Sequence, residues 1–301
     1  MLRNMILGTV LGGYSSLKDR LMDEILEIKR KSGIVGREKE LRQALATKLS
    51  GRHLLIEGEV GTGKTTLALA IAQHFDQPFY RVDGDERFTE SKLVGYFDPP
   101  LVIEKGYNWD TFIKGPLTSA MLEGGILYLN EMNRLPEGTQ NVLLPALDER
   151  RIVIPKLGEV EAKEGFMVIA TENPAEHVGT TALSEALKDR FVWIGLNYQT
   201  EEEEREIVML RSGVEEDVAE KAVAITRQTR EDPNIRRGAS VRGAIDLASI
   251  VTRLGHEKAD NWIEASIMAL STKIELHDGL ERGKRDIITE IVRATLEKDF
   301  F

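Results

Sequence analysis

The stretch "GEVGTGKT", Gly58 to Thr65, constrains this chain more than any other feature of its sequence. It matches the pattern G-x-x-x-x-G-K-[ST], whose glycines let the backbone turn its N–H groups inward around phosphate oxygens. The apolar run "HLLIE" precedes it and the helical stretch "TTLALAIAQHF" follows it, so the partial positive charge of a helix start adds to the site. The sequence therefore predicts a nucleotide phosphate site formed by Gly58, Glu59, Val60, Gly61, Thr62, Gly63, Lys64, Thr65 and Thr66.

Two side chains of this loop have separate expected roles. Lys64 can reach the β- and γ-phosphates of a nucleotide, and the Thr65 hydroxyl can ligate Mg²⁺. The alternative is a glycine-rich turn without a ligand, but a chance match between a strand and a helix is rare. The guanine-specific pattern N-K-x-D is absent. The sequence therefore predicts ATP and Mg²⁺ as cofactors.

Short apolar runs separated by helical stretches predict the fold around this loop. Buried parallel strands have this pattern, and their alternation with helices is typical of an α/β layered domain. The runs occupy residues 53–57, 79–82, 126–129, 166–170 and 191–196. They predict an α/β core in which a parallel five-stranded sheet lies between helices.

The pattern changes after Tyr198, where the strand-like runs end. The stretch "TEEEEREIVMLRSG" has a threonine cap, an acidic first turn and a final glycine, all typical of a helix. Further helices are predicted over 214–229, 239–254, 260–275 and 285–298. The expected organisation is an N-terminal helical extension over 1–32, a nucleotide-binding domain over 33–197 and an all-helical domain over 198–301.

The apolar run "ILYL" ends in Asn130 and Glu131. In a parallel sheet the ligand lies beyond the carboxyl ends of the strands, so both side chains are expected to reach the site of Lys64. Glu131 is the candidate base that orients and polarises the attacking water. The alternative is that Glu131 only pairs with Arg134 on the next helical turn. The strand-end position favours the catalytic role.

Asn130 stands where a carboxylate usually holds Mg²⁺ or its water shell. Its amide oxygen can still accept a hydrogen bond from a metal-bound water, because Mg²⁺ keeps several waters when it binds. As an outer-shell change, the loss is expected to cost about 10–100-fold in metal affinity or rate. We therefore expect slow hydrolysis, with nucleotide binding alone as the alternative.

Bulk composition narrows the class of protein. The chain has no cysteine, which excludes disulfides and thiolate metal sites and suits the cytoplasm. No apolar run approaches the roughly 20 residues that span a bilayer. The N-terminal segment "MLRNMILGTVLGGYSS" has no convincing signal-peptide cleavage site and is interpreted as a strand or docking segment. The net charge of −10 disfavours nonspecific nucleic-acid binding, without excluding a local basic channel.

Together these motifs resemble the AAA+ ATPases, and within them the MoxR family of the helix-2-insert group, over about residues 33–250. The segment "GIVGRE" is similar to the one that packs on adenine, which implies that Ile34 and Val35 contact the base. The stretch "NEMNRLPEGTQNVLLPALDERR" is similar to the MoxR segment that spans the second phosphate motif and the helix after it. The family usually has Asp where this chain has Asn130. The resemblance implies an AAA+ P-loop core followed by an all-helical lid domain.

Three further segments resemble family motifs that act at the γ-phosphate. "VIATENP" is similar to sensor 1, with Asn173 as its polar residue. "LSEALKDRF" is similar to the helix of the arginine finger, which implies that Arg190 acts across a subunit boundary. "GASVRGAIDLA" is similar to the sensor 2 helix, with Arg242 as its arginine. Without the family, these residues would be a turn-forming asparagine, a surface salt-bridge arginine and a helix-surface charge.

Two stretches, 98–116 and 150–165, are interpreted as inserted hairpins. Three aromatic residues of the first stretch are expected to hold that hairpin together, and contact with a partner is the alternative. They are Tyr107, Trp109 and Phe112.

Four arginines form a basic cluster in an otherwise acidic chain. They could bind nucleic acid, but pairing with acidic neighbours or a subunit interface is favoured by the net charge. They are Arg227, Arg230, Arg236 and Arg237.

The resemblance implies an ATP-driven remodelling ATPase that assembles into a homo-oligomeric, hexameric ring. It also implies a protein client, such as one with a von Willebrand factor A domain. Two alternatives stay open: a nucleic-acid motor or restriction-type NTPase subunit, and a nucleotide switch that does not hydrolyse. Salt-dependent DNA binding would identify the first, and an ATPase assay with a Glu131→Gln control would identify the second.

Overall fold

The computed structural model describes residues 14–173 and 183–300. The N-terminal apolar segment interpreted from sequence as a strand or docking segment therefore lies largely outside the described residues. By its internal contacts the chain divides into two compact units, Met1–Glu59 with Gly63–Leu196, and Val60–Thr62 with Asn197–Phe301. Each unit has an apolar core of its own.

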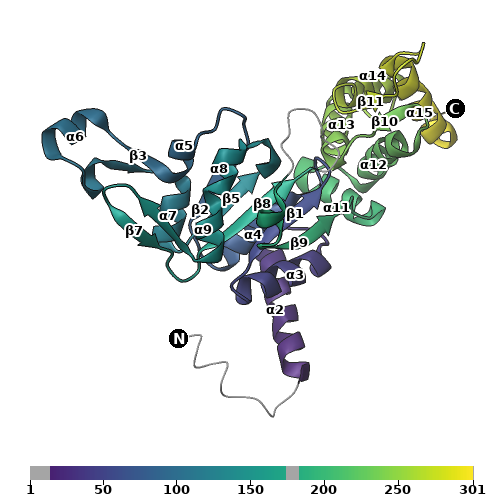
Figure 1. Cartoon of the computed structure of the whole chain (residues 1–301). Coiled ribbons are helices and arrows are strands. Elements are labelled where there is room, and N and C mark those ends of the chain that lie inside the picture. The colour runs from purple at the N-terminus through teal and green to yellow at the C-terminus, as the bar shows by residue number, and fades with distance from the viewer. Residues whose placement is uncertain (1–13, 174–182, 301) are drawn as a thin grey trace. The chain divides into compact units, whose positions relative to one another are not determined.

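The first unit is built on a five-stranded parallel sheet (Figure 1), as the sequence predicted. Its strand order is β2-β5-β8-β1-β9, so the strand that precedes the phosphate loop lies between two others. The carboxyl ends of parallel strands meet at one edge, which is where α/β sheets bind ligands. The strands are β1 (His53–Gly58), β2 (Phe79–Asp83), β5 (Ile126–Asn130), β8 (Met167–Glu172) and β9 (Phe191–Leu196).

Helices cover both faces of this sheet. Successive side chains of a buried strand point to opposite faces, so each strand contributes apolar side chains to two cores. In β5, Ile126 and Tyr128 pack in one core cluster, and Leu127 and Leu129 pack in another. The first cluster is shared with α2 (Tyr14–Ser32), α3 (Glu38–Leu49) and α4 (Lys64–His74). The second is shared with α5 (Glu90–Val94), α7 (Pro116–Glu123), α9 (Leu143–Asp148) and α10 (Glu185–Lys188). Two short elements, η2 (Met132–Arg134) and α8 (Glu137–Asn141), follow β5.

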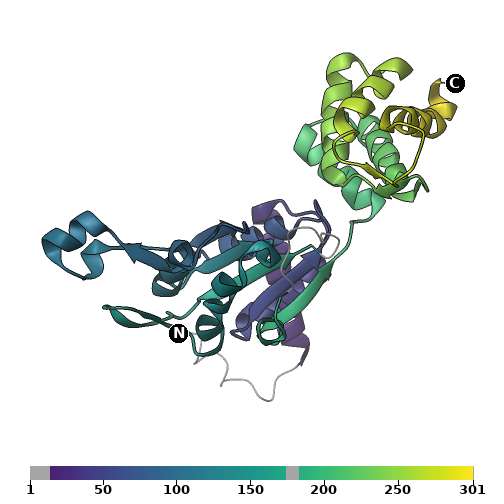
Figure 2. The same cartoon turned by 45° about the horizontal axis from the view of Figure 1, so that its top comes forward.

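The first predicted insertion differs from the hairpin that the sequence suggested. It begins earlier, at β3 (Gly95–Phe97), which pairs in antiparallel fashion with β4 (Phe112–Lys114). Between them lie the helix α6 (Pro99–Lys105) and the 3₁₀ turn η1 (Trp109–Thr111). Asp98 caps α6, and Pro99 occupies its first position, which is a strong helix start. Figures 1 and 2 show this insertion projecting from the body of the first unit.

Aromatic rings hold the insertion together, as interpreted from sequence. Phe112 is buried, and its ring meets those of Phe97 and Trp109 edge-on at centroid distances of 5.0 and 5.9 Å. Tyr107 meets Phe97 in the same way at 4.9 Å. Edge-to-face pairs at these distances are favourable beyond their buried area. The second insertion is a hairpin, β6 (Arg151–Ile154) paired with β7 (Gly158–Glu161), which confirms that prediction.

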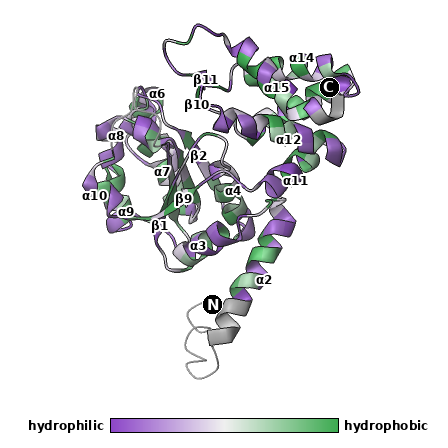
Figure 3. Cartoon of the chain, turned by 90° about the vertical axis from the view of Figure 1, so that its right-hand side faces the viewer, coloured by the Kyte–Doolittle hydropathy of each residue, from purple (hydrophilic) through white to green (hydrophobic). Residues whose placement is uncertain are grey.

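The second unit is helical, and its helices carry hydrophobic and hydrophilic residues together (Figure 3). Its apolar core includes the fully buried side chain of Trp262. The prediction of no strand after Tyr198 is wrong in one detail, since β10 (Ile235–Arg237) and β11 (Glu275–Leu276) form a small antiparallel pair. The helices are α11 (Glu201–Ser212), α12 (Glu216–Glu231), α13 (Val241–Leu254), α14 (Ala259–Leu270) and α15 (Lys284–Phe300).

Within residues 14–173 and 183–300, no helix is both long enough and apolar enough to cross a membrane.

Candidate nucleotide site

The phosphate loop joins the end of β1 to the start of α4. Gly61 and Gly63 have φ angles of +83° and +92°, a conformation that side chains with a Cβ rarely adopt. A Cβ built on Gly63 would meet no atom within 4 Å, so the backbone angle rather than crowding requires glycine there. The Lys64 ammonium bends back into the loop and donates to the carbonyl oxygens of Gly58 and Glu59 at 2.6 and 2.9 Å. The positive charge is therefore positioned inside the loop.

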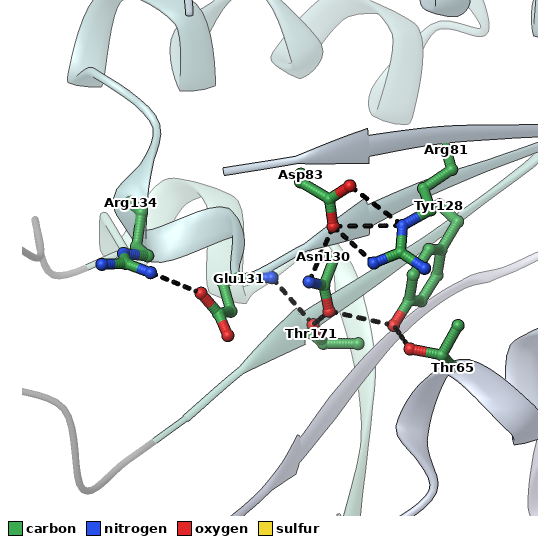
Figure 4. A network of polar contacts seen from close by, with 8 residues as sticks. All are labelled: Thr65, Arg81, Asp83, Tyr128, Asn130, Glu131, Arg134 and Thr171. Atoms are coloured by element: carbon green, nitrogen blue, oxygen red, sulfur yellow. Dashed lines mark hydrogen bonds and ion pairs between the residues drawn. The ribbon is translucent and has the colours of Figure 1, made fainter. Parts of the chain in front are cut away.

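A row of hydroxyl groups connects the phosphate loop to the end of β5 (Figure 4). The Thr65 hydroxyl lies 2.8 Å from the Tyr128 hydroxyl, and the Tyr128 hydroxyl donates to Asn130 Oδ1 at 3.2 Å. Since Tyr128 uses its only proton on Asn130, Thr65 is the donor to Tyr128. Tyr128 is fully buried, and burial raises the pKa of its phenol, which keeps that proton in place. The oxygen lone pairs of Thr65 are then left for a ligand.

The amide of Asn130 has one orientation that satisfies all its neighbours. Its Oδ1 accepts from the hydroxyls of Tyr128 and Thr171, both at 3.2 Å. Its Nδ2 donates to Asp83 Oδ1 at 2.9 Å. A flipped amide would set its oxygen against the Asp83 carboxylate, which can only accept, so the contact with Asp83 fixes the orientation. The prediction that Asn130 contacts the metal stays a prediction, but its oxygen already accepts two hydrogen bonds.

Asp83 is the carboxylate that lies beside Asn130. The two residues are directly opposite in the β2–β5 ladder, at the carboxyl ends of both strands. Arg81, two residues earlier on β2, donates to Asp83 through Nε and Nη2, the latter at 2.7 Å. This hydrogen bond, more than the one from Asn130, holds the pKa of the Asp83 carboxyl below its usual range. Asp83 is therefore ionised at neutral pH.

Glu131 turns the chain sharply away from the sheet. Its φ and ψ are 53° and 54°, which is a left-handed conformation that few residues other than glycine adopt. Its backbone N–H donates to Thr171 Oγ1 on β8 at 2.9 Å, and this contact fixes the turn. Gly84 packs against the same turn, since a Cβ there would lie 2.1 Å from the Glu131 carbonyl oxygen. The Glu131 backbone is thus held from two neighbouring strands.

The Glu131 carboxylate pairs with Arg134, as the structural alternative anticipated. Arg134 Nη1 donates to Glu131 Oε2 at 2.9 Å, with the two side chains 44% and 25% exposed. An exposed ion pair of this kind contributes about 0–1 kcal/mol, so it is easily exchanged for another contact. The catalytic role of Glu131 stays a prediction.

The loop and the strand ends fit a magnesium nucleotide. The loop offers backbone N–H groups, the Lys64 ammonium and the first turn of α4, all of which suit phosphate oxygens. The Thr65 hydroxyl has free lone pairs for a hard cation, and oxygen is the ligand that Mg²⁺ prefers. Thr66, the third residue of α4, is half-buried behind them. The donor set present is therefore suited to the group that the loop motif implies.

Part of the segment expected to pack on adenine is buried in the apolar core. Ile34 and Val35 are 8% and 7% exposed, and Ile34 belongs to the apolar cluster of α2, α3 and α4. The segment follows α2 closely, because Gly33 donates its N–H to the carbonyl of Lys29 at 2.9 Å. Contact with a base stays a prediction.

Asn173 and Arg190 both lie in the first unit. Asn173 directly follows β8 and is 4% exposed, while the residues after it, 174–182, lie outside the described part. Arg190 precedes β9, donates to the carbonyl of Ala186, and pairs with Asp148 at 2.5 Å. In the single chain Arg190 therefore makes the surface salt bridge that was the alternative, and its action across a subunit boundary stays a prediction.

Arg242 lies in the second unit, as the second residue of α13. The sequence placed it one turn further along the helix, because the helix was expected to begin at residue 239. The side chain is exposed. A positive charge in the first turn of a helix opposes the helix dipole, so this position gives the arginine no local stabilisation. The sensor 2 role of Arg242 stays a prediction.

The four arginines of the basic cluster are paired with carboxylates of the same unit. Arg227 and Arg230 both bond Glu204, at 3.1 and 2.8 Å. Arg236 and Arg237 both bond Glu275, at 2.8 and 2.7 Å. The interpretation that acidic neighbours neutralise the cluster is confirmed.

The fold and this site define a phosphate-loop nucleotide-binding protein, and comparison with known proteins gives its family. Residues 53–191 match the family model described as an AAA domain of the dynein-related subfamily. The uncharacterized protein YojN of Bacillus subtilis is 32% identical over 226 residues, which is 73% of each chain. An uncharacterized protein of Staphylococcus haemolyticus is 33% identical over 215 residues, 69% of this chain and 81% of that one. The chain therefore belongs to the family of YojN-like proteins, and its residues 53–191 match the AAA domain.

Solved structures support the fold. NtrX of Brucella abortus, in a complex with ADP, has a TM-score of 0.54 and 22% identity, covering 91% of this chain and 64% of that one. A candidate ATPase of Cytophaga hutchinsonii has a TM-score of 0.50 and 22% identity, covering 93% of this chain and 97% of that one. At this identity the likeness shows the fold alone. The AAA+ fold predicted from sequence is confirmed, and the finer MoxR assignment belongs to the proposal below.

Sequence analysis missed four members of the network in Figure 4, namely Arg81, Asp83, Tyr128 and Thr171. One signal could have found Asp83. It follows the apolar run "FYRV", and polar residues at the carboxyl ends of adjacent parallel strands gather at one edge. Tyr128 looked like an ordinary buried residue of "ILYL", because nothing in the sequence shows where its hydroxyl points.

Proposed function

We propose that the protein is an ATP-hydrolysing AAA+ ATPase of the MoxR type, which acts in a ring as a remodelling or assembly factor for a protein client. The observation that carries this proposal is the hydroxyl row from Thr65 through Tyr128 to Asn130. It joins the phosphate loop to the strand end that bears Glu131. A loop that served only to reverse the chain would not require hydrogen bonds to the end of β5.

The phosphate-binding role belongs to the loop. Residues 58–66 wrap the β- and γ-phosphates, and Lys64 exchanges its carbonyl contacts for phosphate oxygens. Thr65 contributes its hydroxyl to Mg²⁺. Bound there, Mg²⁺ would neutralise part of the phosphate charge and orient the γ-phosphate. Ile34 and Val35 contact the adenine.

Glu131 is the proposed base. Hydrolysis requires its carboxylate to leave Arg134 and accept a hydrogen bond from the attacking water. Asn173, at the end of the neighbouring strand β8, aligns that water and senses the γ-phosphate. The turn that fixes the Glu131 backbone against Thr171 limits where the carboxylate can reach, which favours a single orientation.

The proposal includes a homo-oligomeric, hexameric ring with residues 33–197 as the nucleotide-binding domain and residues 198–301 as the lid. In a ring, Arg190 of one subunit would stabilise charge at the site of its neighbour. Arg242 would bring the lid to the phosphate. The ring acts in the cytoplasm on a protein client such as one with a von Willebrand factor A domain.

A nucleotide switch without hydrolysis is the second candidate, and the Glu131–Arg134 ion pair favours it. If the pair persists with nucleotide bound, no base faces the water. A nucleic-acid motor has less support, because the basic cluster of the second unit is neutralised by Glu204 and Glu275.

The deciding experiment measures ATP hydrolysis and nucleotide binding in the same preparations. The wild type should hydrolyse ATP in a Mg²⁺-dependent way, and Glu131→Gln should abolish hydrolysis while it retains binding. An Arg134→Gln variant separates the two candidates, because release of Glu131 should keep or raise the rate. Hydrolysis by assembled wild type no faster than by Glu131→Gln establishes the switch instead. Client capture then uses the Glu131→Gln protein in Mg²⁺-ATP.

A further inference from the structure

The proposed magnesium site has a neutral amide at position 130, where a carboxylate would balance the charge of the metal. The nearest candidate for the missing charge is on the next strand. Asp83 lies opposite Asn130 in the parallel ladder, and its Oδ1 accepts from Asn130 Nδ2 at 2.9 Å. A carboxylate therefore lies one strand away from position 130.

Every polar contact of the Asn130 side chain supports one arrangement. The Asp83 carboxylate can only accept, so it holds the Asn130 N–H₂ group toward itself and leaves the amide oxygen facing the hydroxyls of Tyr128 and Thr171. Asp83 is thus connected to Thr65 through three hydrogen bonds in series, by way of Asn130 and Tyr128. The same bonds leave the lone pairs of the Thr65 oxygen available.

We propose that Asp83 supplies the carboxylate charge of the magnesium site that position 130 lacks, and that Asn130 is the residue that positions it. This inference rests on the proposed nucleotide site. It assigns Asp83 an outer-shell role, through the water shell and the field at the metal, because three hydrogen bonds separate it from Thr65.

A surface ion pair with Arg81 is a simpler explanation for the presence of Asp83 at this position. That explanation does not account for the hydrogen bond between Asp83 and Asn130. Arg81 and Asp83 are 47% and 59% exposed, which is a setting in which such pairs add little stability. An ion pair of that kind has no need for Asn130, nor for a buried tyrosine that holds the Asn130 amide in place. The exposure also means that Asp83 can turn toward a cation without the penalty of breaking a buried pair.

The arrangement predicts an unexpected effect of the Asn130→Asp substitution. An aspartate at position 130 would set two carboxylates at hydrogen-bond distance, and like charges there disfavour each other. The substitution should therefore weaken the site unless Asp83 is neutralised at the same time. The pair Asp83→Asn with Asn130→Asp exchanges the two groups and keeps one carboxylate and one amide.

The test compares nucleotide affinity with and without metal. Binding of a fluorescent ATP analogue is titrated in EDTA and in Mg²⁺, in a Glu131→Gln background that blocks hydrolysis. The ratio of the two dissociation constants measures what the metal adds. Asp83→Asn and Asn130→Asp should each lower this ratio by about 10–100-fold, and the exchanged double variant should recover most of it. The affinity in EDTA should stay within a few-fold.

Arg81→Gln is the matched control, since it removes the ion pair and keeps Asp83 beside Asn130. It should keep the metal-dependent ratio. Binding of Mn²⁺ followed by its electron paramagnetic resonance signal gives a second readout that does not involve hydrolysis, and thermal unfolding shows that the variants are folded.

Three outcomes would overturn the role of Asp83. They are an unchanged ratio in Asp83→Asn, a ratio in Arg81→Gln that falls as far as in Asp83→Asn, or no recovery in a folded double variant. If the Glu131→Gln parent binds no nucleotide in either medium, the nucleotide site itself fails, and the role of Asp83 fails with it.

Discussion

Glu204 in the second unit and Asp83 in the first are both carboxylates paired with arginine, but they are built into the molecule differently. The Glu204 side chain is 3% exposed, and each of its oxygens accepts from a different arginine, Arg227 or Arg230. The Asp83 side chain is 59% exposed and shares its oxygens between Arg81 and an amide. The Glu204 carboxylate is buried and both its oxygens are paired, whereas the Asp83 carboxylate is exposed to solvent at the carboxyl end of its strand.

This difference separates charges that hold the fold from charges that are available to a ligand. A buried pair is costly to break, because removal of one partner leaves a charge without compensation. An exposed pair contributes little to stability, so its presence at a strand end needs another reason. By this criterion Glu204 is structural, and Asp83, Glu131 and Arg190 are candidates for function.

Substitution of Arg190 is expected to have the largest effect, which is on the ATPase rate. It tests whether a partly exposed ion pair marks a functional charge. Its side chain is 26% exposed, and its acid partner, Asp148, is 53% exposed. Arg190→Ala should lower the ATPase rate by about 10³–10⁵-fold, because an arginine finger contributes this much where it has been dissected. Mixing it with Glu131→Gln subunits should restore part of the activity, in a way that depends on the mixing ratio and on protein concentration.

Asp148→Asn is the control for Arg190. It removes the ion pair of the single chain but leaves the arginine, so activity should stay within a few-fold of wild type. Equal losses in Asp148→Asn and Arg190→Ala, or no recovery in verified mixed assemblies, would assign Arg190 to the structural class with Glu204.

Glu204→Gln should give the largest loss of stability. It leaves Arg230, which is 14% exposed and stacks on Tyr198 at 4.0 Å, without its buried partner. Breaking such a pair costs about 3–5 kcal/mol, to be measured by urea denaturation. Glu206→Gln is the matched control in the same helix, at an exposed position, and should change stability by less than about 0.5 kcal/mol. Comparable values for the two variants would break the distinction between the enclosed and the open carboxylates.

His53 extends the comparison to a buried group that stays neutral. Burial, with a contribution from the Arg150 charge, lowers the pKa of its imidazole to about 4, and Val168 N–H donates to its Nδ1 at 3.0 Å. The unfolded chain therefore binds the proton first. Stability from this group is complete above about pH 6.5 and declines by about 3 kcal/mol as the pH falls to about 4.

Unfolding free energies measured from pH 7.5 to pH 4.5 test this statement. His53→Asn retains an acceptor for Val168 and cannot titrate, so its stability should depend less on pH than that of the wild type. His277→Gln changes an exposed histidine and should leave the wild-type slope. The interpretation of His53 would be wrong if both variants kept the same slope.

The smallest expected effect is the change in stability of Asp83→Asn. Loss of an exposed ion pair should cost less than about 1 kcal/mol in urea denaturation, although the same substitution should remove most of the metal-dependent affinity. A loss as large as that of Glu204→Gln would place Asp83 among the structural charges.

The sequence predicted the sheet well because its three central strands, β5, β8 and β1, are buried on both faces. The run at 191–196 has the bounds of β9, and the other runs differ from their strands by one or two residues. The one-residue error in β2 mattered most. The apolar run ends at Val82, but ladder hydrogen bonds do not depend on side-chain polarity, so pairing continues to Asp83.

The errors elsewhere have similar physical causes. The predicted helix over 260–275 continued too far, because Ile274 is a core residue although the helix ends at Leu270. The site could be predicted as far as local motifs reach, which includes the loop, Asn130 and Glu131. The contact of Asn130 with Asp83 depends on the pairing of β2 with β5, and no local pattern contains that information.

Asp83 also lies between the phosphate loop and the projecting insertion, because it ends the row of hydrogen bonds from Thr65 and precedes β3 in the chain. Only residues 84–94 separate Asp83 from Gly95, where β3 begins, and this segment contains Gly84, pressed against the Glu131 turn, and the helix α5. The row of hydrogen bonds and this covalent segment together form one continuous path from the Thr65 hydroxyl to the base of the insertion.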